Sequence, residues 1–550
     1  MNNLFSKKWS TWFVYSLVSL AIMFPLLKPG YVFALDMVFG PNIKLPNDIV
    51  ASYPFFLALK FFSFLLPVQI IQKALLFLVI VLCGYGAHKL TLYFHQKGEV
   101  APGSYFAGIF YAMNPFTYAR FMDGQYTVLL GYALLPFFAL ALLKMIFDKD
   151  YSKHSVFRLS LITLLISIIS IHAVGYMVVF IFAAIVVRVR QVRPGIAQLK
   201  KLLKPLGMAF VIVLIVSSYW TIPIFTSNTP REQLVSNFDN RYLLSFRTDG
   251  TNGISVVTNV LSLNGYWGDR EGRYILQRQA SPIWFLLAIT MISLTGYGFY
   301  LSRSNPRARA LLLSAIIGLV LAVGIAAPPF SSFNQFLYNH LPFYRAFREP
   351  QKFVSLIALF YAVMGGAGLN YLLKNKKLKN QTSKTWLVTL ALLLPVVYTP
   401  TFIWGFNGQL KSSQYPKDWA EVNNQYIKKA KGSVLFLPWH QYMYFGFAGR
   451  VISNPGPIYF DGNVIAGDNA QIGLLETQLA NIRSDRIAKA LASKSPAEIQ
   501  KVLKNYDIQY ILLSKNVDWR NYSFLDNQSQ LIKSKETSTL KLFTNSTYAK

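Results

Sequence analysis

The sequence predicts a polytopic α-helical membrane protein that ends in a small C-terminal α/β domain. Of its 550 residues, 53% are hydrophobic and only 14% are charged, whereas soluble domains carry about 25% charged residues. Apolar windows near the ~20 residues needed to cross a bilayer recur along the first three quarters of the chain. Beyond about residue 405, short helical and strand patterns alternate, which is typical of an α/β domain.

Eleven apolar windows are predicted to cross the membrane. They are 9–27, 70–94, 104–121, 126–146, 156–171, 173–188, 206–226, 281–302, 308–327, 353–373 and 385–405. Segment 53–68 is shorter, carries Lys60 at its centre and ends at Pro67. We expect this segment to lie in the membrane interface or to re-enter without crossing.

The basic residues predict the orientation of the helices. If 53–68 does not cross, every dense Lys/Arg cluster up to the last span falls on one side, and these clusters mark the cytoplasm. If it did cross, all later clusters would fall outside. The prediction is therefore about eleven helices in the plasma membrane, with a cytoplasmic N-terminus and an extracytoplasmic C-terminus. It gives a transmembrane domain 1–405, with outer loops 28–69, 227–280 and 328–352, and an extracytoplasmic domain 406–550.

Several functional classes are disfavoured by what the sequence contains. The net charge of +31 would indicate a nucleic-acid partner only if the basic residues gathered on a soluble domain. Here the basic residues lie between apolar runs. The expected partner is therefore the lipid bilayer, and no nucleic-acid partner is expected. The spans carry few ionisable groups, which disfavours an ion-coupled carrier. No phosphate-binding loop, metal-ligand spacing or disulfide framework is recognisable, and Cys83 is the single cysteine.

The C-terminal domain is predicted from five elements. Residues 417–431 have helical spacing, and a second helix over 493–506 begins at Ser495-Pro496. Strands are expected at 433–437 and 508–513, with a weaker one at 539–543.

Three carboxylates are candidates for chemistry on the outer face. Asp36 lies in the first polar break, Lys28–Ser52, between apolar neighbours, and burying it carries a desolvation cost. Asp48 lies in the same loop, and Asp123 lies in a tight turn between two spans. The alternatives are that Asp36 points harmlessly into water, and that Asp123 completes a turn with Gly124 or pairs with Arg120.

Two arginines suit a phosphate group. Arg345 and Arg348 stand three residues apart just before a span, and the guanidinium fork matches phosphate oxygens. A structural pair with Glu349, or an interface anchor, is the alternative.

Aromatic and polar side chains on the outer face could contact a sugar. Residues 264–270 combine Tyr266 and Trp267 with Asp269 and Arg270, a composition that suits sugar stacking but also a membrane-interface belt. Three further candidates are Arg120 and Gln125, at the two ends of the 120–125 turn, and His172, at the outer end of a span. For His172 the alternative is a hydrogen bond to a neighbouring carbonyl.

The layout resembles the GT-C superfamily of membrane glycosyltransferases. The shared features are many spans, a first outer loop with an acidic residue and interfacial helices, and an external C-terminal domain. The stretch from Asn114-Pro115-Phe116 through Asp123-Gly124-Gln125 to Gly131–Pro136 is similar to a signature of large bacterial and archaeal membrane proteins. These are related to the arabinofuranosyltransferases and to a family that glycosylates cell-wall polymers. The motifs Asn264–Arg270, Phe347–Pro350 and Leu435–His440 add to the resemblance.

The resemblance implies that a sugar is moved from a polyprenyl-phosphate donor to an extracytoplasmic acceptor, a cell-envelope glycan or glycoconjugate. It assigns the role of catalytic base to the acid of the first outer loop, which is Asp36 here. This loop has no Asp-x-Asp pair, so neither a divalent metal nor another cofactor is expected. The lipid-linked sugar would be a substrate, with its phosphate on Arg345 or Arg348.

Two rival hypotheses remain open at the level of sequence. A non-catalytic membrane protein that binds or flips lipid-linked glycans would explain the same apolar body and outer loops without needing Asp36. A sensor or scaffold built around the external domain would place the function in residues 406–550.

Overall fold

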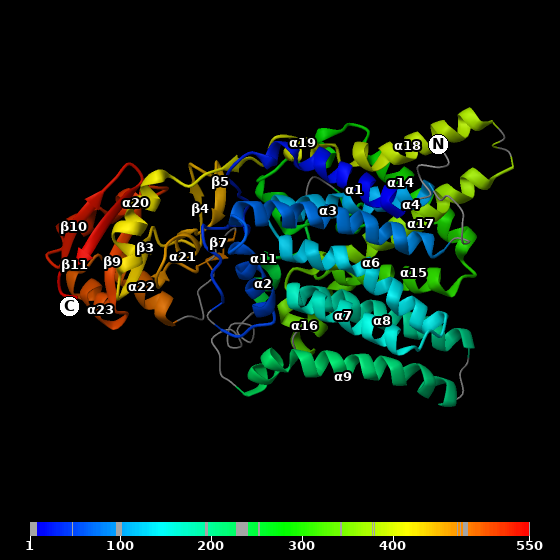
Figure 1. The fold of residues 1–550 in the computed structure, drawn as a ribbon, viewed down its shortest axis with the longest axis horizontal. Helices are drawn as coiled ribbons and strands as arrows, with labels where there is room; N and C mark the ends of the chain where they lie inside the picture. Colours follow the sequence, from blue (N-terminus) through cyan, green and yellow to red (C-terminus); the bar gives the residue numbers. More distant parts are fainter. Residues whose placement is uncertain are drawn as a thin grey trace.

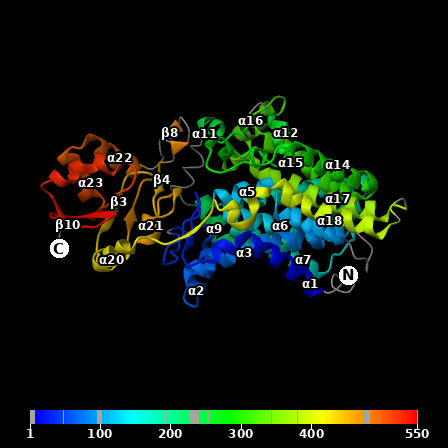
Figure 2. The same ribbon diagram turned by 90° about the horizontal axis from the view of Figure 1, so that it is seen from above.

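A computed structural model describes residues 8–46, 48–94, 102–192, 196–226, 240–250, 254–341, 344–376, 378, 380–469, 471–472, 475–476 and 482–548. Long helices form a bundle, and the C-terminal part continues from one end of that bundle along the long axis of the molecule (Figures 1 and 2). Residues 47, 227–239, 251–253 and 342–343 of the predicted outer loops lie outside the described residues.

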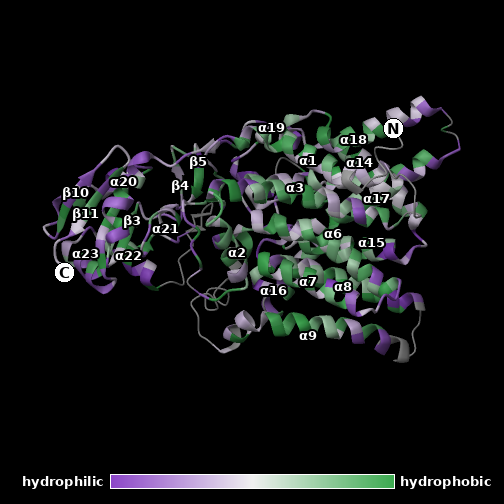
Figure 3. Ribbon diagram, viewed as in Figure 1, coloured by the Kyte–Doolittle hydropathy of each residue, from purple (hydrophilic) through white to green (hydrophobic). Residues whose placement is uncertain are grey.

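The bundle is built around α17 (Val354–Lys374), which is buried along most of its length. The other long helices are α1 (Lys8–Met23), α3 (Val68–Leu92), α6 (Tyr126–Phe147), α7 (Lys153–Ile169), α8 (Ile171–Val192), α9 (Ile196–Thr226), α14 (Trp284–Ser302), α15 (Pro306–Val323) and α18 (Gln381–Tyr398). Figure 3 shows hydrophobic residues along most of these helices and a mixed pattern in the C-terminal part.

Within the described residues, eight helices are long and apolar enough to cross a membrane. The number is nine if α18 and the segment Pro400–Asn407, bent from it by 71°, form one span. The molecule therefore has a multi-pass membrane fold, and nine of the eleven predicted windows correspond to these spans. The remaining two windows, 104–121 and 156–171, do not.

The window 104–121 is two helices and not one. α4 (Pro102–Ala112) ends before Asn114, and α5 (Pro115–Met122) begins after it. The Asn114 side chain accepts a hydrogen bond from the Thr117 N–H at 3.2 Å, while Thr117 Oγ1 accepts one from the Asn114 N–H at 3.1 Å. This capping box, followed by proline at the first helical position, starts a new helix and prevents α4 from continuing.

The segment predicted to lie in the interface contains α2 (Tyr53–Ser63), a helix of 11 residues. α2 is too short to cross a bilayer. Large apolar side chains are exposed along it and just beyond it, at Leu57, Phe61, Phe62, Phe64, Leu65 and Leu66. A continuous apolar surface of this kind suits contact with lipid.

Shorter helices connect the spans at the end of the bundle that faces the C-terminal part. They are α11 (Asn240–Ser245), α12 (Val256–Leu261), α13 (Gln277–Ala280) and α16 (Phe330–His340), with 3-10 turns η1 (Phe24–Leu27), η2 (Trp267–Glu271), η3 (Tyr344–Phe347) and η4 (Pro350–Phe353).

The C-terminal part contains a five-stranded sheet in the order β10-β11-β9-β3-β6. These strands are β3 (Ser433–Leu437), β6 (Val464–Ile465), β9 (Ile508–Ser514), β10 (Leu531–Glu536) and β11 (Leu540–Asn545). β3 runs parallel to β6 and β9, and β11 runs antiparallel to β9 and β10. The strands predicted at 433–437 and 508–513 are β3 and β9.

Helices accompany this sheet. They are α20 (Lys417–Gln425), α21 (Gly456–Tyr459), α22 (Ile482–Ser493) and α23 (Pro496–Asn505), with 3-10 turns η6 (Ile427–Lys429) and η7 (Trp519–Asn527). The preceding η5 (Pro400–Phe402) and α19 (Ile403–Asn407) belong to the bundle, where η5 packs on α18 and α19 on α1. The predicted helix 417–431 ends earlier, because α20 stops at Gln425 and η6 follows.

Two small sheets lie between the bundle and the large sheet. β1 (Tyr31–Val32) of the first outer loop pairs with β2 (Ser412–Ser413). β4 (Tyr442–Phe445) and β5 (Arg450–Ser453) form an antiparallel hairpin, which the sequence analysis did not predict. A further pair, β7 (Gln471–Ile472) and β8 (Leu475–Glu476), is also antiparallel. The first outer loop is thereby joined to the C-terminal part by backbone hydrogen bonds.

Candidate active site

The Asp36 loop rests on the turn between α5 and α6. The Asp36 N–H donates to the Asp123 carbonyl at 2.9 Å. Gly124 in this turn has a φ of +73°, and a Cβ at this position would lie 2.6 Å from the Met37 backbone nitrogen. Only glycine combines this backbone conformation with so close an approach. The Asp-Gly-Gln turn is therefore the platform that positions the Asp36 loop.

The Asp36 carboxylate reaches solvent although its neighbours do not. Leu35 and Met37 are buried, whereas the Asp36 side chain is exposed. Protein nevertheless surrounds the carboxylate on most sides, and this burial raises its pKa to about 6. The Tyr442 hydroxyl donates to Asp36 Oδ1 at 2.8 Å and acts in the opposite direction, lowering the pKa.

A second group of charges lies behind Asp36, centred on Glu349. The Glu349 carboxylate pairs with Arg120 Nη1 at 3.1 Å and with Lys352 Nζ at 3.5 Å. Arg120 also donates to Gln125 Oε1 at 2.6 Å, and its guanidinium lies 4.1 Å from the centre of the Tyr266 ring. All five side chains are buried. Burial alone would raise the pKa of Glu349, but Lys352 and Arg120 outweigh it and hold that pKa well below its usual range.

Asp123 is paired with Arg273 and not with Arg120. Arg273 Nη2 lies 3.0 Å from Asp123 Oδ2, and the guanidinium of Arg273 lies over the Trp267 ring at 5.1 Å. A Cβ at Gly268 would lie 2.9 Å from Asp123 Oδ2, so glycine lets the 264–270 loop approach this pair. Burial raises the pKa of Asp123, and Arg273 only partly offsets it.

The two predicted phosphate ligands, Arg345 and Arg348, contact different parts of the protein. The Arg348 guanidinium lies 4.9 Å from the Phe246 ring centre, and its charge acts on the pKa of both Glu349 and Tyr442. Arg345 Nε donates to the Tyr338 carbonyl at 3.4 Å. Arg348 therefore stands with the Asp36 and Glu349 groups, and Arg345 faces α16.

The 264–270 loop is packed into the protein. Tyr266 and Trp267 are buried under Arg120 and Arg273 and are not presented to solvent. The Tyr274 hydroxyl donates to Asp269 Oδ1 at 2.7 Å, and burial raises the pKa of Asp269 to about 6. Arg270 donates to the Ser245 carbonyl. In this structure these side chains hold the loop in place.

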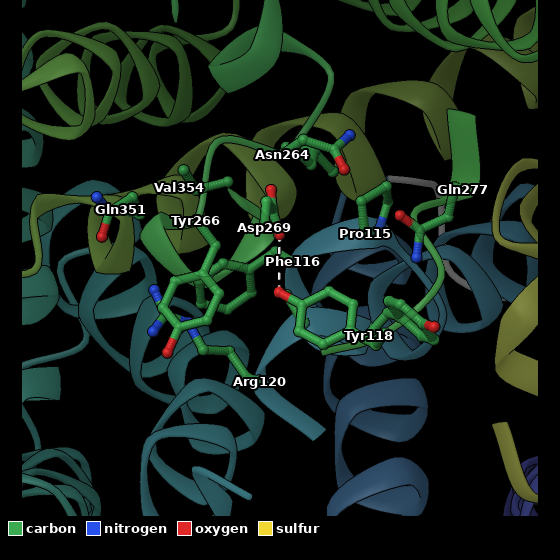
Figure 4. A pocket seen from close by; sticks show the side chains of 13 residues that line it. Pro115, Phe116, Tyr118, Arg120, Asn264, Tyr266, Asp269, Gln277, Gln351 and Val354 are labelled. Carbon is green, nitrogen blue, oxygen red and sulfur yellow. Dashed lines mark hydrogen bonds between the residues drawn. The ribbon is translucent and has the colours of Figure 1, made fainter. Parts of the chain in front are cut away.

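A small cavity lies beside this loop (Figure 4). Its volume is about 10 Å³, and Arg120, Tyr266, Asp269 and Gln351 contribute to its wall. A space of this size fits about one water molecule. It is part of the packing behind the candidate active site and has no room for a sugar.

His172 lies near the candidate active site, whereas Asp48 does not. The centre of the His172 ring is 6.0 Å from that of the Phe347 ring, and the charges of Glu349 and Arg348 act on it. Asp48 is exposed, and in the described part of the chain no hydrogen bond or ion pair joins it to the other acids.

Sequence reasoning missed three members of this arrangement. Lys352 and Arg273 balance the buried acids, and Tyr442 contacts Asp36. The spacing of Glu349 and Lys352, three residues apart, was a usable signal, because such residues share one face of a helical turn. Nothing in the sequence marks Tyr442.

Among the residues that the structure describes, no group of three or more His, Cys, Asp or Glu side chains could hold a metal ion.

No protein-family model matches the sequence, and no curated protein matches it. Among solved structures, the chain is similar to the arabinofuranosyltransferase AftD from Mycobacteria. The TM-score is 0.63 at 13% identity, and the match covers 97% of this chain and 40% of AftD. A mutant AftD structure matches with a TM-score of 0.63 at 12% identity, covering 98% of this chain and 41% of the other.

The similarity establishes the fold. The chain has the fold of the solved AftD structures. The chain spans about two fifths of the length of AftD.

Proposed function

We propose that this protein is an integral-membrane glycosyltransferase that moves a sugar from a polyprenyl-phosphate donor to an acceptor on the outer face. The observation that carries the proposal is Asp36, a solvent-reaching carboxylate between buried neighbours, whose pKa is raised to about 6. A base with a pKa just below neutral pH is mostly deprotonated and still able to accept a proton. The GT-C fold supports the same reaction class.

In the proposed reaction Asp36 removes the proton from the acceptor hydroxyl. The acceptor oxygen attacks the anomeric carbon of the donor sugar, and the bond from that carbon to the phosphate oxygen breaks. The electron pair leaves with the polyprenyl phosphate. No nucleotide is consumed, because the leaving group is already a phosphate.

Arg348 is the proposed ligand of the donor phosphate, and Arg345 the second candidate. Arg348 acts on the pKa of Tyr442, the residue that contacts Asp36. A guanidinium at this place would neutralise the charge that develops on the leaving phosphate. The charge pairs of Glu349 and Asp123 would keep the surrounding loops rigid, which positions donor and acceptor.

The outer-face location is part of the proposal. Contacts of Asp36, Gln125, Tyr266 and Glu349 bring together the first outer loop, the 120–125 turn and the loops 227–280 and 328–352. These are the connections that the positive-inside rule places outside.

The experiment is a transfer assay with Asp36→Asn in proteoliposomes. The probe donor is a radiolabelled polyprenyl-phospho-arabinofuranose, chosen after the sugar in the name of AftD, and the acceptor is a short arabinofuranoside. We expect the transfer rate to fall by about 10²–10⁴-fold, the range that a general base contributes. Asp48→Asn is the matched control, because Asp48 lies in the same loop and is exposed; it should transfer at the wild-type rate.

If Asp36→Asn transfers sugar as fast as the wild type, Asp36 is not the base. Binding of the lipid-linked sugar without transfer by any variant, the wild type included, would favour the non-catalytic binding protein.

A further inference from the structure

The hairpin β4–β5 of the C-terminal part sits directly on the Asp36 peptide. Tyr442 and Ser453 face each other across the hairpin as paired residues. The Tyr442 hydroxyl donates to Asp36 Oδ1 at 2.8 Å, and the Ser453 N–H donates to the Leu35 carbonyl at 2.7 Å. One residue pair therefore holds both the carboxylate and the peptide group that precedes it.

The base of the hairpin is fixed by further hydrogen bonds. The Asn454 N–H donates to the Gln441 carbonyl at 2.7 Å, and Asn454 Nδ2 donates to the His440 carbonyl at 3.1 Å. The Gly456 N–H donates to Asn454 Oδ1 at 3.0 Å. The position of the Tyr442 hydroxyl is thus set by a closed local network and not by a free loop.

Asp36 is held from the opposite side by the membrane part. Its own N–H donates to the Asp123 carbonyl at 2.9 Å. The Asp36 peptide is consequently clamped between the α5–α6 turn and the β4–β5 hairpin. The two clamping elements lie far apart in the sequence, since the turn contains Asp123 and the hairpin begins at Tyr442.

We propose that Tyr442 is a positioning residue that fixes the Asp36 carboxylate and stabilises its ionised form, so that the C-terminal part completes the active site. This inference rests on the proposed role of Asp36 as the base. A phenol is a suitable donor here, because a hydrogen bond to a charged acceptor is stronger than one between neutral groups. Burial raises the pKa of Tyr442, and the charge of Asp36 raises it further. The Tyr442 hydroxyl therefore keeps its proton.

The acids near Asp36 disfavour its ionised form, and the Tyr442 hydroxyl opposes them. Asp123 and Glu349 both raise the pKa of Asp36 by their negative charge, and burial raises it further. The amide of Gln125 lowers it, as Tyr442 does, and Tyr266 lies within the field of Asp36. Without Tyr442, Gln125 would be the one remaining donor among these groups to oppose the rise in the pKa of Asp36 that burial and the two acids cause.

The test uses Tyr442→Phe in the full-length protein. The transfer rate is measured against pH with the same radiolabelled donor and acceptor. Removing a hydrogen bond to a charged group should move the acid limb of the profile upward by about one pH unit. The rate at pH 6 should fall several-fold and recover as the pH rises. Tyr444→Phe is the matched control, since Tyr444 lies on the same strand with half of its side chain exposed, and it should leave the profile unchanged.

A second readout does not depend on catalysis. Infrared difference spectra between the full-length protein and its Asp36→Asn variant follow the protonation of this carboxyl group directly. The same upward shift is expected in the Tyr442→Phe background. A Tyr442→Phe protein whose midpoint equals that of the wild type overturns the role of Tyr442, whatever the fate of Asp36 as the base. Full activity in Asp36→Asn together with a shifted infrared midpoint would overturn the proposed function and leave the Tyr442 contact standing.

Discussion

At the scale of single residues, the structure explains why Asp36 differs from the other acids of the outer loops. Asp123 is paired with the half-buried Arg273, and Glu349 with the buried Arg120 and Lys352. Asp36, in contrast, contacts a neutral phenol and reaches solvent. A neighbouring cation lowers the basicity of a carboxylate: it holds the pKa of Glu349 low and partly offsets the burial that raises the pKa of Asp123. Of these three acids, Asp36 is the one that forms no ion pair in the described part of the chain, and it is thus the one suited to accept a proton.

Gly124 gives a prediction at this scale. Gly124→Ala places a Cβ against the Met37 backbone at a φ of +73°, which should cost about 1–3 kcal/mol. Because the Asp36 loop must then move, the transfer rate should fall, by up to about 10²-fold for a displacement near 1 Å. Thermal unfolding and the transfer assay measure the two effects.

The matched control is Gly207→Ala. Gly207 lies inside α9, and a Cβ there meets nothing within 4 Å. This change should leave activity intact and be neutral or slightly stabilising, because alanine favours helix over glycine. Equal losses in both variants would contradict the role assigned to the 123–125 turn.

At the scale of elements, sequence patterns predicted those that are determined locally. Apolar length identified the long helices, and the spacing of hydrophobic residues identified β3 and β9. The break between α4 and α5 was missed, because averaging hydrophobicity over 104–121 conceals an Asn-Pro pair that starts a new helix. The capping box at Asn114 was a readable local signal.

The contacts that the hairpin β4–β5 makes with the Asp36 loop were missed for a different reason. β4 and β5 pair with each other, but Ser453 and Tyr442 bind residues that lie hundreds of positions earlier in the sequence. Contacts of this kind depend on the tertiary fold and produce no periodic pattern in the sequence. The same holds for the pairing of Arg120 with Glu349 and of Arg273 with Asp123, where sequence reasoning had suggested local partners.

At the scale of the whole molecule, the helix bundle and the C-terminal part meet around one group of residues. The first outer loop pairs with β2 and receives the Ser453 and Tyr442 hydrogen bonds. Candidate residues from four separate outer segments converge there. Most of the residues that the sequence singled out are therefore close together, although their mutual contacts could not be predicted.

The orientation in the membrane can be tested with cysteine labelling. The single native cysteine, Cys83, is buried, so the background is low. A membrane-impermeant maleimide added to intact cells should label Ser493→Cys in the C-terminal part. It should label Lys153→Cys, on the predicted cytoplasmic side, only after permeabilisation. Both positions are exposed in the structure, so the reverse pattern would place the candidate active site in the cytoplasm.

The most direct test of the central claim is the pH dependence of sugar transfer by the wild type. Since the pKa of Asp36 is raised to about 6 and only the ionised form can accept a proton, the rate should increase as the pH rises through about 6 and then level off. The residual activity of Asp36→Asn should lack this step. A wild-type profile that is flat across this range, or a step that persists in Asp36→Asn, would contradict the assignment of Asp36 as the base.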